Sequence, residues 1–194
     1  MTIKSAFAAV ALALAAAAPA HAVPIAYEGT ITAGTPVTGS VSGDGWETEN
    51  AAGVDFWRVN GVAGQSFSVR GTRLNANLDP ALTLYFGTTA ADASQFLHDA
   101  DWGGLVFLAI ADDEVPVASG PGADPLLSNF RLPFTGLYTI AIGGFSSNGA
   151  GPFSYSMQTT QIAAAVPEPE TVMLMSAGLG LLLAVQRRRK ARRA

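Results

Sequence analysis

The sequence contains no cysteine among its 194 residues. This absence excludes disulfide cross-links, a nucleophilic thiol, and any zinc or iron–sulfur site that depends on thiolate ligands. Histidine is almost as scarce, because only His21 and His98 occur. A Ser-His-Asp triad would have to use His98, and the Gly-x-Ser-x-Gly turn that positions the serine of many hydrolases is missing. The sequence therefore gives little support for nucleophilic or zinc-dependent catalysis.

Basic side chains are rare in the middle of the chain. Residues 23–166 hold four arginines against thirteen carboxylates, whereas the whole chain has a formal charge of only −4 because its other basic residues lie near the two ends. A segment with so strong a negative charge repels nucleic acid and anionic membranes. We therefore expect no nucleic-acid partner. The carboxylates could bind hard cations or simply keep the protein soluble.

The first 22 residues have the three parts of a secretory signal peptide. Lys4 supplies a positive charge, residues 6–18 form an apolar run rich in alanine, and Ala20 and Ala22 provide the small residues of a cleavage site. The run is too short to be a good membrane span. The pattern predicts that signal peptidase cuts after Ala22, the alternative being an uncleaved N-terminal anchor helix.

The C-terminal end combines three patterns in sequence. A stiff acidic segment is followed by an uncharged apolar run over residues 171–185 and then by a basic cluster. The acidic segment is Val166, Pro167, Glu168 and Pro169, and the basic cluster begins with Arg187, Arg188, Arg189 and Lys190. The run approaches the length of a transmembrane helix, and the basic cluster is expected to stay in the cytoplasm and stop translocation. These residues alone also fit a plain single-pass anchor.

This combination resembles the PEP-CTERM sorting signal of Gram-negative bacteria. The resemblance implies that exosortase, a membrane transpeptidase-like enzyme, recognises the tail and cuts near the Pro-Glu-Pro motif. It also implies an inner-membrane intermediate, delivery to the cell surface or extracellular matrix, and association with exopolysaccharide or biofilm. The apolar helix would then be a removable address, as in a GPI signal. The chain divides accordingly into a signal peptide (1–22), one folded domain (23–165) and a sorting signal (166–194).

Between the two signals the sequence has the pattern of an all-β protein. Short runs rich in β-branched and aromatic residues are separated by Gly, Pro, Asn and Asp, which is typical of an antiparallel sandwich. In one run Leu82 and Leu84 alternate with Thr83 and Tyr85, so the two sets face opposite sides of a sheet. We predict a short helix near residues 90–97 as an insertion between strands. The expected strands cover residues 38–41, 55–59, 66–70, 81–86, 106–109, 128–132, 136–142 and 153–159.

The domain also resembles the bacterial pre-peptidase C-terminal domain. The segments that carry this resemblance follow the family's order: residues 54–59, 63–65, 78–85, Asp112-Asp113, 133–140 and 153–157. The resemblance implies a single jelly-roll-like antiparallel β-sandwich, flanked here by an N-terminal signal helix and a C-terminal transmembrane helix. It further implies an accessory module without catalytic activity of its own. Some members of that family bind calcium or polymers such as collagen.

Calcium is the cofactor that the carboxylates could bind, because hard cations prefer several oxygens held by loops. The acidic candidates are Asp44, Glu47 and Glu49; Asp99 and Asp101; and Asp112, Asp113 and Glu114. The loop at Asp99 is not an EF-hand, since Ile110 occupies the position of the bidentate glutamate. The family resemblance selects Asp55 as a calcium ligand, with Glu47, Glu49 and Asn50 as neighbours, although residues 51–53 lack the further acid of calcium-binding relatives. The alternative is that all these acids are solvated.

These observations predict a non-enzymatic exported surface or matrix protein. One alternative is a calcium-dependent adhesion or carbohydrate-binding module, with Trp46 and Trp102 as exposed platforms for sugar rings. Another is an exported hydrolase that uses two loop carboxylates. We expect one residue of the pair Phe56 and Trp57 to lie in the core, and His98 to be an exposed loop residue.

Overall fold

The computed structural model describes residues 23–162 and 174–179. The chain divides into two units, residues 1–161 and 162–194, which are treated separately. In the second unit, residues 174–179 are helical and exposed. Within the described ranges no helix combines the length and the hydropathy that a membrane span requires. The predicted signal peptide and most of the predicted sorting signal lie outside the described residues.

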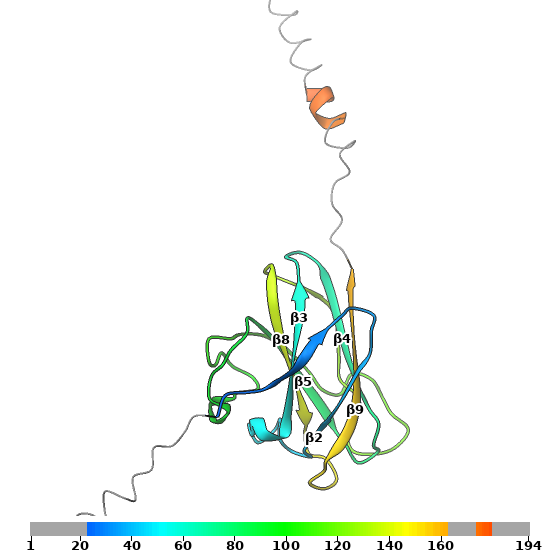
Figure 1. Cartoon of the computed structure of the whole chain (residues 1–194). Helices are drawn as coiled ribbons and strands as arrows, with labels where there is room; N and C mark the ends of the chain where they lie inside the picture. The colour runs from blue at the N-terminus through cyan, green and yellow to red at the C-terminus, as the bar shows by residue number, and fades with distance from the viewer. Residues whose placement is uncertain (1–22, 163–173, 180–194) are drawn as a thin grey trace, which may run out of the picture. The chain divides into compact units, whose positions relative to one another are not determined.

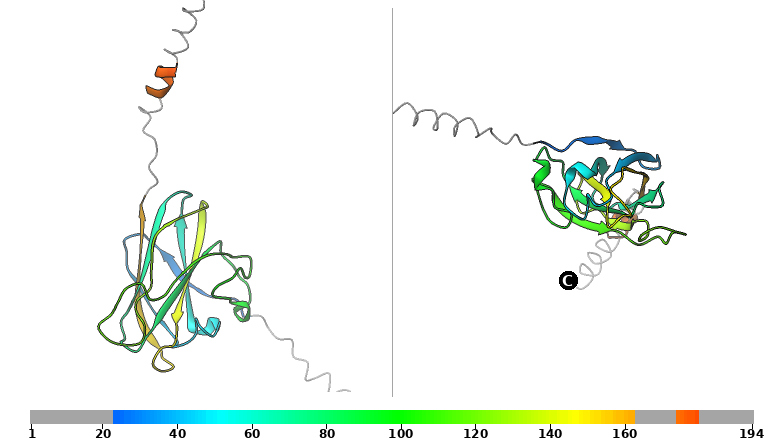
Figure 2. Two further views of the ribbon diagram at one scale, coloured as in Figure 1. Left: turned by 180° about the vertical axis from the view of Figure 1, so that it is seen from behind. Right: turned by 90° about the horizontal axis from the view of Figure 1, so that it is seen from below.

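The first unit is an all-β sandwich of two sheets, which confirms the predicted fold class (Figures 1 and 2). One sheet has the strand order β1-β3-β8-β5-β6 and the other has the order β2-β9-β4-β7. The strands are β1 (Tyr27–Ile31), β2 (Val37–Val41), β3 (Val54–Gly61), β4 (Ser66–Arg73), β5 (Pro80–Phe86), β6 (Val106–Ala111), β7 (Leu126–Arg131), β8 (Gly136–Gly144) and β9 (Phe153–Ile162).

All eight predicted strands are present, and the structure adds β1. The β1 sequence, YEGTI, has no run of apolar residues, and its burial alternates between partly covered and exposed positions. It pairs in parallel with β3, so the sandwich is not purely antiparallel as expected. The edge position explains the weak sequence signal, because only one side of an edge strand is hydrogen-bonded and covered.

In place of the predicted helix near residues 90–97, the structure has only a 3-10 turn, η2 (Ala93–Gln95). The carboxylate of Asp92 accepts a hydrogen bond from the Ser94 amide and starts the turn, but Phe96 returns to extended backbone and is buried. Further along, the Tyr85 hydroxyl donates to the Leu97 carbonyl, and the Thr83 hydroxyl donates to the His98 carbonyl at 2.7 Å. Side chains of β5 thus hold this segment against the sheet in place of a helix.

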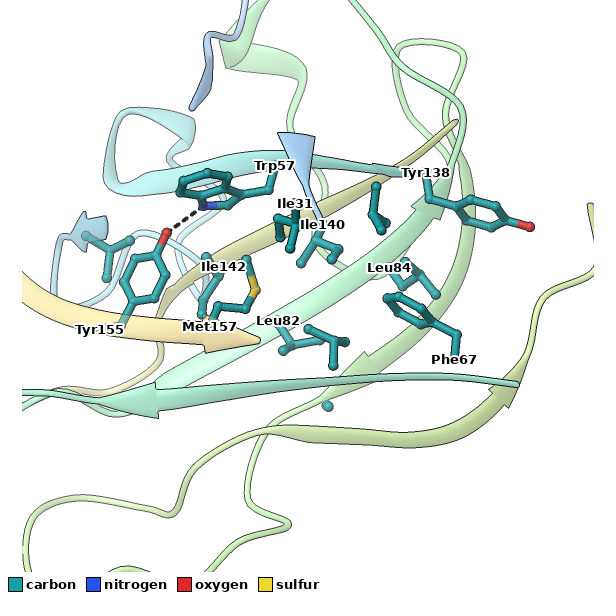
Figure 3. Packing of buried hydrophobic residues seen from close by; sticks show 14 of the residues in the cluster. Ile31, Trp57, Phe67, Leu82, Leu84, Tyr138, Ile140, Ile142, Tyr155 and Met157 are labelled. Carbon is teal, nitrogen blue, oxygen red and sulfur yellow. Dashed lines mark hydrogen bonds between the residues drawn. The ribbon is translucent and has the colours of Figure 1, made fainter. Parts of the chain in front are cut away.

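The main core lies between the two sheets (Figure 3). Leu82 and Leu84 of β5 point into it, as the alternation predicts, and they meet Phe67 of β4 and Met157 of β9. All four side chains are completely buried. Full burial of one such side chain stabilises the fold by about 1.5–3 kcal/mol, so this cluster is a major source of stability.

A second core covers the outer face of the five-stranded sheet. Residues 42–53 and 87–105, the latter green in Figure 1, supply much of this cover. Phe56 belongs to this outer cluster and the next residue, Trp57, belongs to the inner core, so both members of the pair are buried. Trp46 and Trp102 are also buried, at 4% and 5% exposure, which shows that the prediction of exposed sugar platforms was wrong.

Candidate functional site

Asp55, the first predicted calcium ligand, lies in a hydrogen-bond chain that joins the two sheets. Its Oδ2 accepts a hydrogen bond from the Tyr155 hydroxyl at 2.7 Å and another from the Ser40 amide at 3.1 Å. The same hydroxyl accepts from the Trp57 indole at 2.7 Å (Figure 3). Burial raises the pKa of Asp55, and the hydrogen bond from Tyr155 opposes that rise. Asp55 belongs to β3 in one sheet, and its partners belong to β2 and β9 in the other sheet. Its hydrogen bonds therefore connect the two sheets, which is a structural role.

Gly39 makes this chain possible. It stands opposite Tyr155 in the pairing of β2 with β9. A Cβ atom at this position would lie 2.2 Å from the Asp55 carboxylate and 2.4 Å from the Tyr155 hydroxyl. Only glycine leaves room for the Asp55 carboxylate and the Tyr155 phenol at this point. Glycine at position 39 is therefore required for the hydrogen bond between these two side chains.

The other two predicted ligands point to different partners. Glu47 accepts hydrogen bonds from the Ser146 amide at 3.2 Å and from the Ser146 hydroxyl at 3.1 Å. Glu49 Oε1 lies 3.2 Å from His98 Nδ1. Within the described ranges, Glu49 groups with His98 and Asp99 as possible metal ligands, whereas Glu47 and Asp55 belong to no such group. The structure therefore does not bring Asp55, Glu47 and Glu49 together.

His98 is less exposed than the sequence suggested. Its side chain retains 23% of its accessible surface, and its ring packs against Trp46 with centroids 4.2 Å apart. The Trp46 indole in turn donates to the Thr83 hydroxyl at 3.0 Å. His98 thus helps to cover the outer core, and the partly exposed Glu49 is its acidic neighbour.

A second acidic cluster forms where β5 begins and β6 ends. Asp79 directly precedes β5, and Asp112 and Asp113 directly follow β6. These strands pair antiparallel with Leu82 opposite Ala111, which brings the three acids to the same end of the sheet. One carboxylate oxygen of each residue lies within 4.8 Å of the others. Sequence reasoning placed Asp112 and Asp113 in a loop but missed Asp79, which only the pairing of β5 with β6 reveals.

Arg73, the last residue of β4, is the basic residue beside this cluster. Its Nε donates to Asp124 Oδ1 at 2.8 Å, and its Nη1 donates to the Pro121 carbonyl at 2.5 Å. The remaining nitrogen, Nη2, lies 3.7 Å from Asp79 Oδ1, which is beyond hydrogen-bond distance. Arg73 is therefore engaged mainly with the loop formed by residues 112–125 and compensates the charge of Asp79 only in part.

Burial and mutual repulsion disfavour the charged forms of these acids. Burial raises the pKa of Asp79 from 3.8 to about 6; repulsion by Asp113 adds to the rise, and attraction by Arg73 opposes it. Burial likewise raises the pKa of Asp112 to about 7, with further contributions from Asp113 and Asp79. The cluster thus carries more negative charge than its surroundings stabilise.

Two hollows lie elsewhere, near Val23. One, of about 290 Å³, is lined by Glu28 and Asp55 among other residues, and the other, of about 490 Å³, is lined by Glu49 and Asp92. Neither includes Asp79 or the acids after β6. The carboxylate of Asp55 in the first hollow already accepts two hydrogen bonds, so it is poorly placed to act on a substrate.

The C-terminal segment can be compared with known families. Residues 165–190 match the family model of the PEP-CTERM protein-sorting motif. The chain carries a PEP-CTERM sorting signal. This signal implies export to the cell surface and processing by exosortase. The match begins one residue before the predicted boundary and includes the Pro-Glu-Pro motif, the apolar run and the first basic residues.

Several solved structures are similar to about 70% of this chain. One is CorA, a surface-associated copper-binding protein of Methylomicrobium album BG8, with 14% identity over 70% of this chain and 98% of that chain, at a TM-score of 0.48. Another is the pre-peptidase C-terminal domain of a Bacillus anthracis collagenase, with 15% identity over 70% and 97%, at 0.43. A third is PliG of Aeromonas hydrophila, a periplasmic inhibitor of g-type lysozyme, with 14% identity over 71% and 100%, at 0.40. No curated protein sequence matches the chain.

Proposed function

We propose that this chain is a non-enzymatic protein that is delivered to the cell surface or extracellular matrix, where its sandwich associates with exopolysaccharide. The PEP-CTERM signal at residues 165–190 carries the delivery step. In this proposal signal peptidase removes residues 1–22, the apolar run holds an intermediate in the inner membrane, and exosortase cuts near the Pro-Glu-Pro motif. The released product is the acidic sandwich.

The contacts of the reactive side chains support a non-enzymatic role. Asp55 is hydrogen-bonded between the sheets, Glu47 is held by Ser146, and His98 packs on Trp46. A general acid or base must reach the proton that it transfers. Each of these groups instead faces a neighbour that stabilises the fold.

Binding of a polysaccharide would need a surface other than the buried tryptophans. Phe134 offers one, because its side chain is 44% exposed and its ring lies against Phe86, with centroids 4.7 Å apart. It is close to the exposed Val62, since the Ala63 amide donates to the hydroxyl of Thr135, the residue after Phe134. An aromatic ring held in this way can stack on a sugar ring at little conformational cost.

The delivery step is tested by the mass and location of the exported chain in its host. We expect a product that lacks the basic C-terminal end and is found at the surface or in the medium. Replacing Pro167, Glu168 and Pro169 with alanine should leave a longer chain in the inner membrane, whereas Glu170→Ala should be processed normally. A wild-type chain that keeps its basic end would refute processing.

The binding step is tested separately by retention of the exported protein on the host's own exopolysaccharide. Phe134→Ala should lose most of the retention, and Leu74→Ala, which alters another exposed apolar side chain, should not. Normal processing with no retention of the wild-type protein would overturn the binding proposal and leave delivery intact.

A further inference from the structure

We infer that Asp79, Asp112 and Asp113 form a calcium-binding site at the end of the sandwich where β5 begins and β6 ends. This site is distinct from the one expected at Asp55. It is also independent of the sorting signal, because all three ligands belong to the folded domain.

The spacing of the carboxylates suits one calcium ion. One oxygen from each of the three residues lies within 4.8 Å of the other two. Calcium–oxygen distances are about 2.3–2.6 Å, so two oxygens on opposite sides of one ion are separated by about 5 Å at most. Three carboxylates can also supply up to about six oxygens when each binds through both, which approaches the coordination number of calcium.

An unmet hydrogen-bonding capacity points to a ligand at this position. Asp79 is only 5% exposed, its Oδ1 accepts no hydrogen bond from any described residue, and its ion-pair partner, Arg73 Nη2, lies 3.7 Å away. Asp112 Oδ1 is also buried and has no such partner among the described residues. Buried carboxylate oxygens normally have a hydrogen-bond donor or a cation beside them. A metal ion bound by Asp79, Asp112 and Asp113 would add positive charge that Arg73, 3.7 Å from Asp79 Oδ1, supplies only in part.

The neighbouring groups already have partners, so the charge of the cluster is compensated only in part, by Arg73. Glu114 accepts hydrogen bonds from the Asp112 and Leu126 amides, at 3.0 and 2.9 Å. Asp124 is bound to Arg73 at 2.8 Å, and Asp113 accepts from the amide of Ala123. Five carboxylates lie in this part of the fold, and the Arg73 guanidinium is ion-paired with two of them, Asp79 and Asp124. A divalent cation would reduce this excess, and the same hydrogen bonds hold the loop in place to receive it.

The ligand type selects a hard cation. The three residues offer only carboxylate oxygens, which favour calcium or magnesium over copper and zinc. Magnesium requires near-ideal octahedral geometry and keeps several waters, whereas calcium accepts irregular sets of carboxylates on loops. Gly122 brings the backbone of the 112–125 loop against the Asp79 carboxylate, where any Cβ atom would lie 2.0 Å from Oδ1. Only glycine fits at this position of the loop.

The experiment uses the exported chain, purified in mild detergent and stripped with EGTA. We expect calcium to bind in a calorimetric titration and to raise the melting temperature by about 5 °C or more at saturation, with a smaller effect of magnesium. Asp112→Asn and Asp113→Asn should each weaken calcium binding at least about tenfold, because each removes a charged ligand. Asp44→Asn, which removes an equal charge at an exposed position, should bind calcium as the wild type does.

Asp79→Asn is reserved as a third variant, since a change at a buried position can alter folding. If Asp113→Asn loses calcium binding and keeps an unchanged circular dichroism spectrum, the site is supported even when Asp79→Asn does not fold. Absence of calcium binding by the wild type would overturn the inference. Binding that survives Asp112→Asn and Asp113→Asn but disappears in Glu47→Gln would overturn it as well, because the ion would then lie elsewhere.

Discussion

The Tyr155 hydroxyl joins the two sheets through two short hydrogen bonds. It donates to Asp55 and accepts from Trp57, both at 2.7 Å, and its surroundings exclude water. Burial and the adjacent Asp55 carboxylate raise the pKa of Tyr155, so the hydroxyl keeps its proton and remains a donor. Both hydrogen bonds therefore depend on one oxygen atom, that of the Tyr155 hydroxyl.

Tyr155→Phe removes that atom, which leaves the Trp57 indole without its acceptor and the Asp55 carboxylate with only the Ser40 amide as a donor. We expect the free energy of unfolding to fall by about 1–3 kcal/mol, since each unsatisfied buried polar group carries a desolvation cost. Urea denaturation measures the change. In a double-mutant cycle with Asp55→Asn, the two effects should not be additive, because the residues interact directly. Strictly additive effects would argue against the hydrogen-bond chain.

The segment at residues 87–105 covers the outer face of the five-stranded sheet and adds a second core to the sandwich. Phe96, Trp102 and Leu105 insert from it onto the outer face of β5 and β8, where Tyr85 receives them. Trp102 contacts the rings of Phe56 and Phe96 at centroid distances of 6.0 and 5.5 Å. The segment therefore contributes core rather than an exposed binding loop.

Trp102→Ala should destabilise the fold strongly, because it opens a large cavity under the segment. We expect a loss of about 3–5 kcal/mol in the free energy of unfolding, the usual range for a buried tryptophan. Leu74→Ala at an exposed position should change it by less than about 0.5 kcal/mol. Equilibrium urea titrations of the two variants make the comparison. A mild effect of Trp102→Ala would mean that the outer core packs loosely.

For the molecule as a whole, the distribution of charge makes stability depend on pH. Asp79 and Asp112 have folded-state pKa values near 6 and 7, above their ordinary value of 3.8. Between pH 4 and pH 7 the folded state therefore holds protons that the unfolded state has released. Stability from these two groups is present at the acidic end of this window and is lost as the pH rises through it.

Asp112→Asn provides the test of this pH dependence. In EGTA, the variant should be more stable than the wild type at pH 8, because its amide has no charge to bury. The difference in melting temperature should shrink steadily and approach zero at pH 4. Asp44→Asn should show no comparable trend. A constant difference across this range would contradict the assigned pKa shift of Asp112.

The sequence was sufficient for eight of the nine described strands but not for β1 or for what covers the sheets. Alternation of Leu82 and Leu84 with Thr83 identified β5 correctly, because the period of a strand is local. The covered outer face was missed, since Trp46 and Trp102 lie in glycine-rich loops whose paths depend on distant contacts. The approach of Asp79 to Asp112 was missed for the same reason. The two residues are far apart in the sequence, and only the antiparallel pairing of β5 with β6 brings the start of one strand next to the end of the other.

Strand β9, the last of the domain, lies between β2 and β4 in the interior of its sheet. Its partner β2 is one of the first strands to be made, so this sheet cannot close until nearly the entire domain has been synthesised. Only a few residues then separate β9 from the Pro-Glu-Pro motif. The strand that completes this sheet is thus the part of the domain nearest to the sorting signal in the sequence. A chain that ended before Phe153 would leave β2 and β4 without the strand that lies between them.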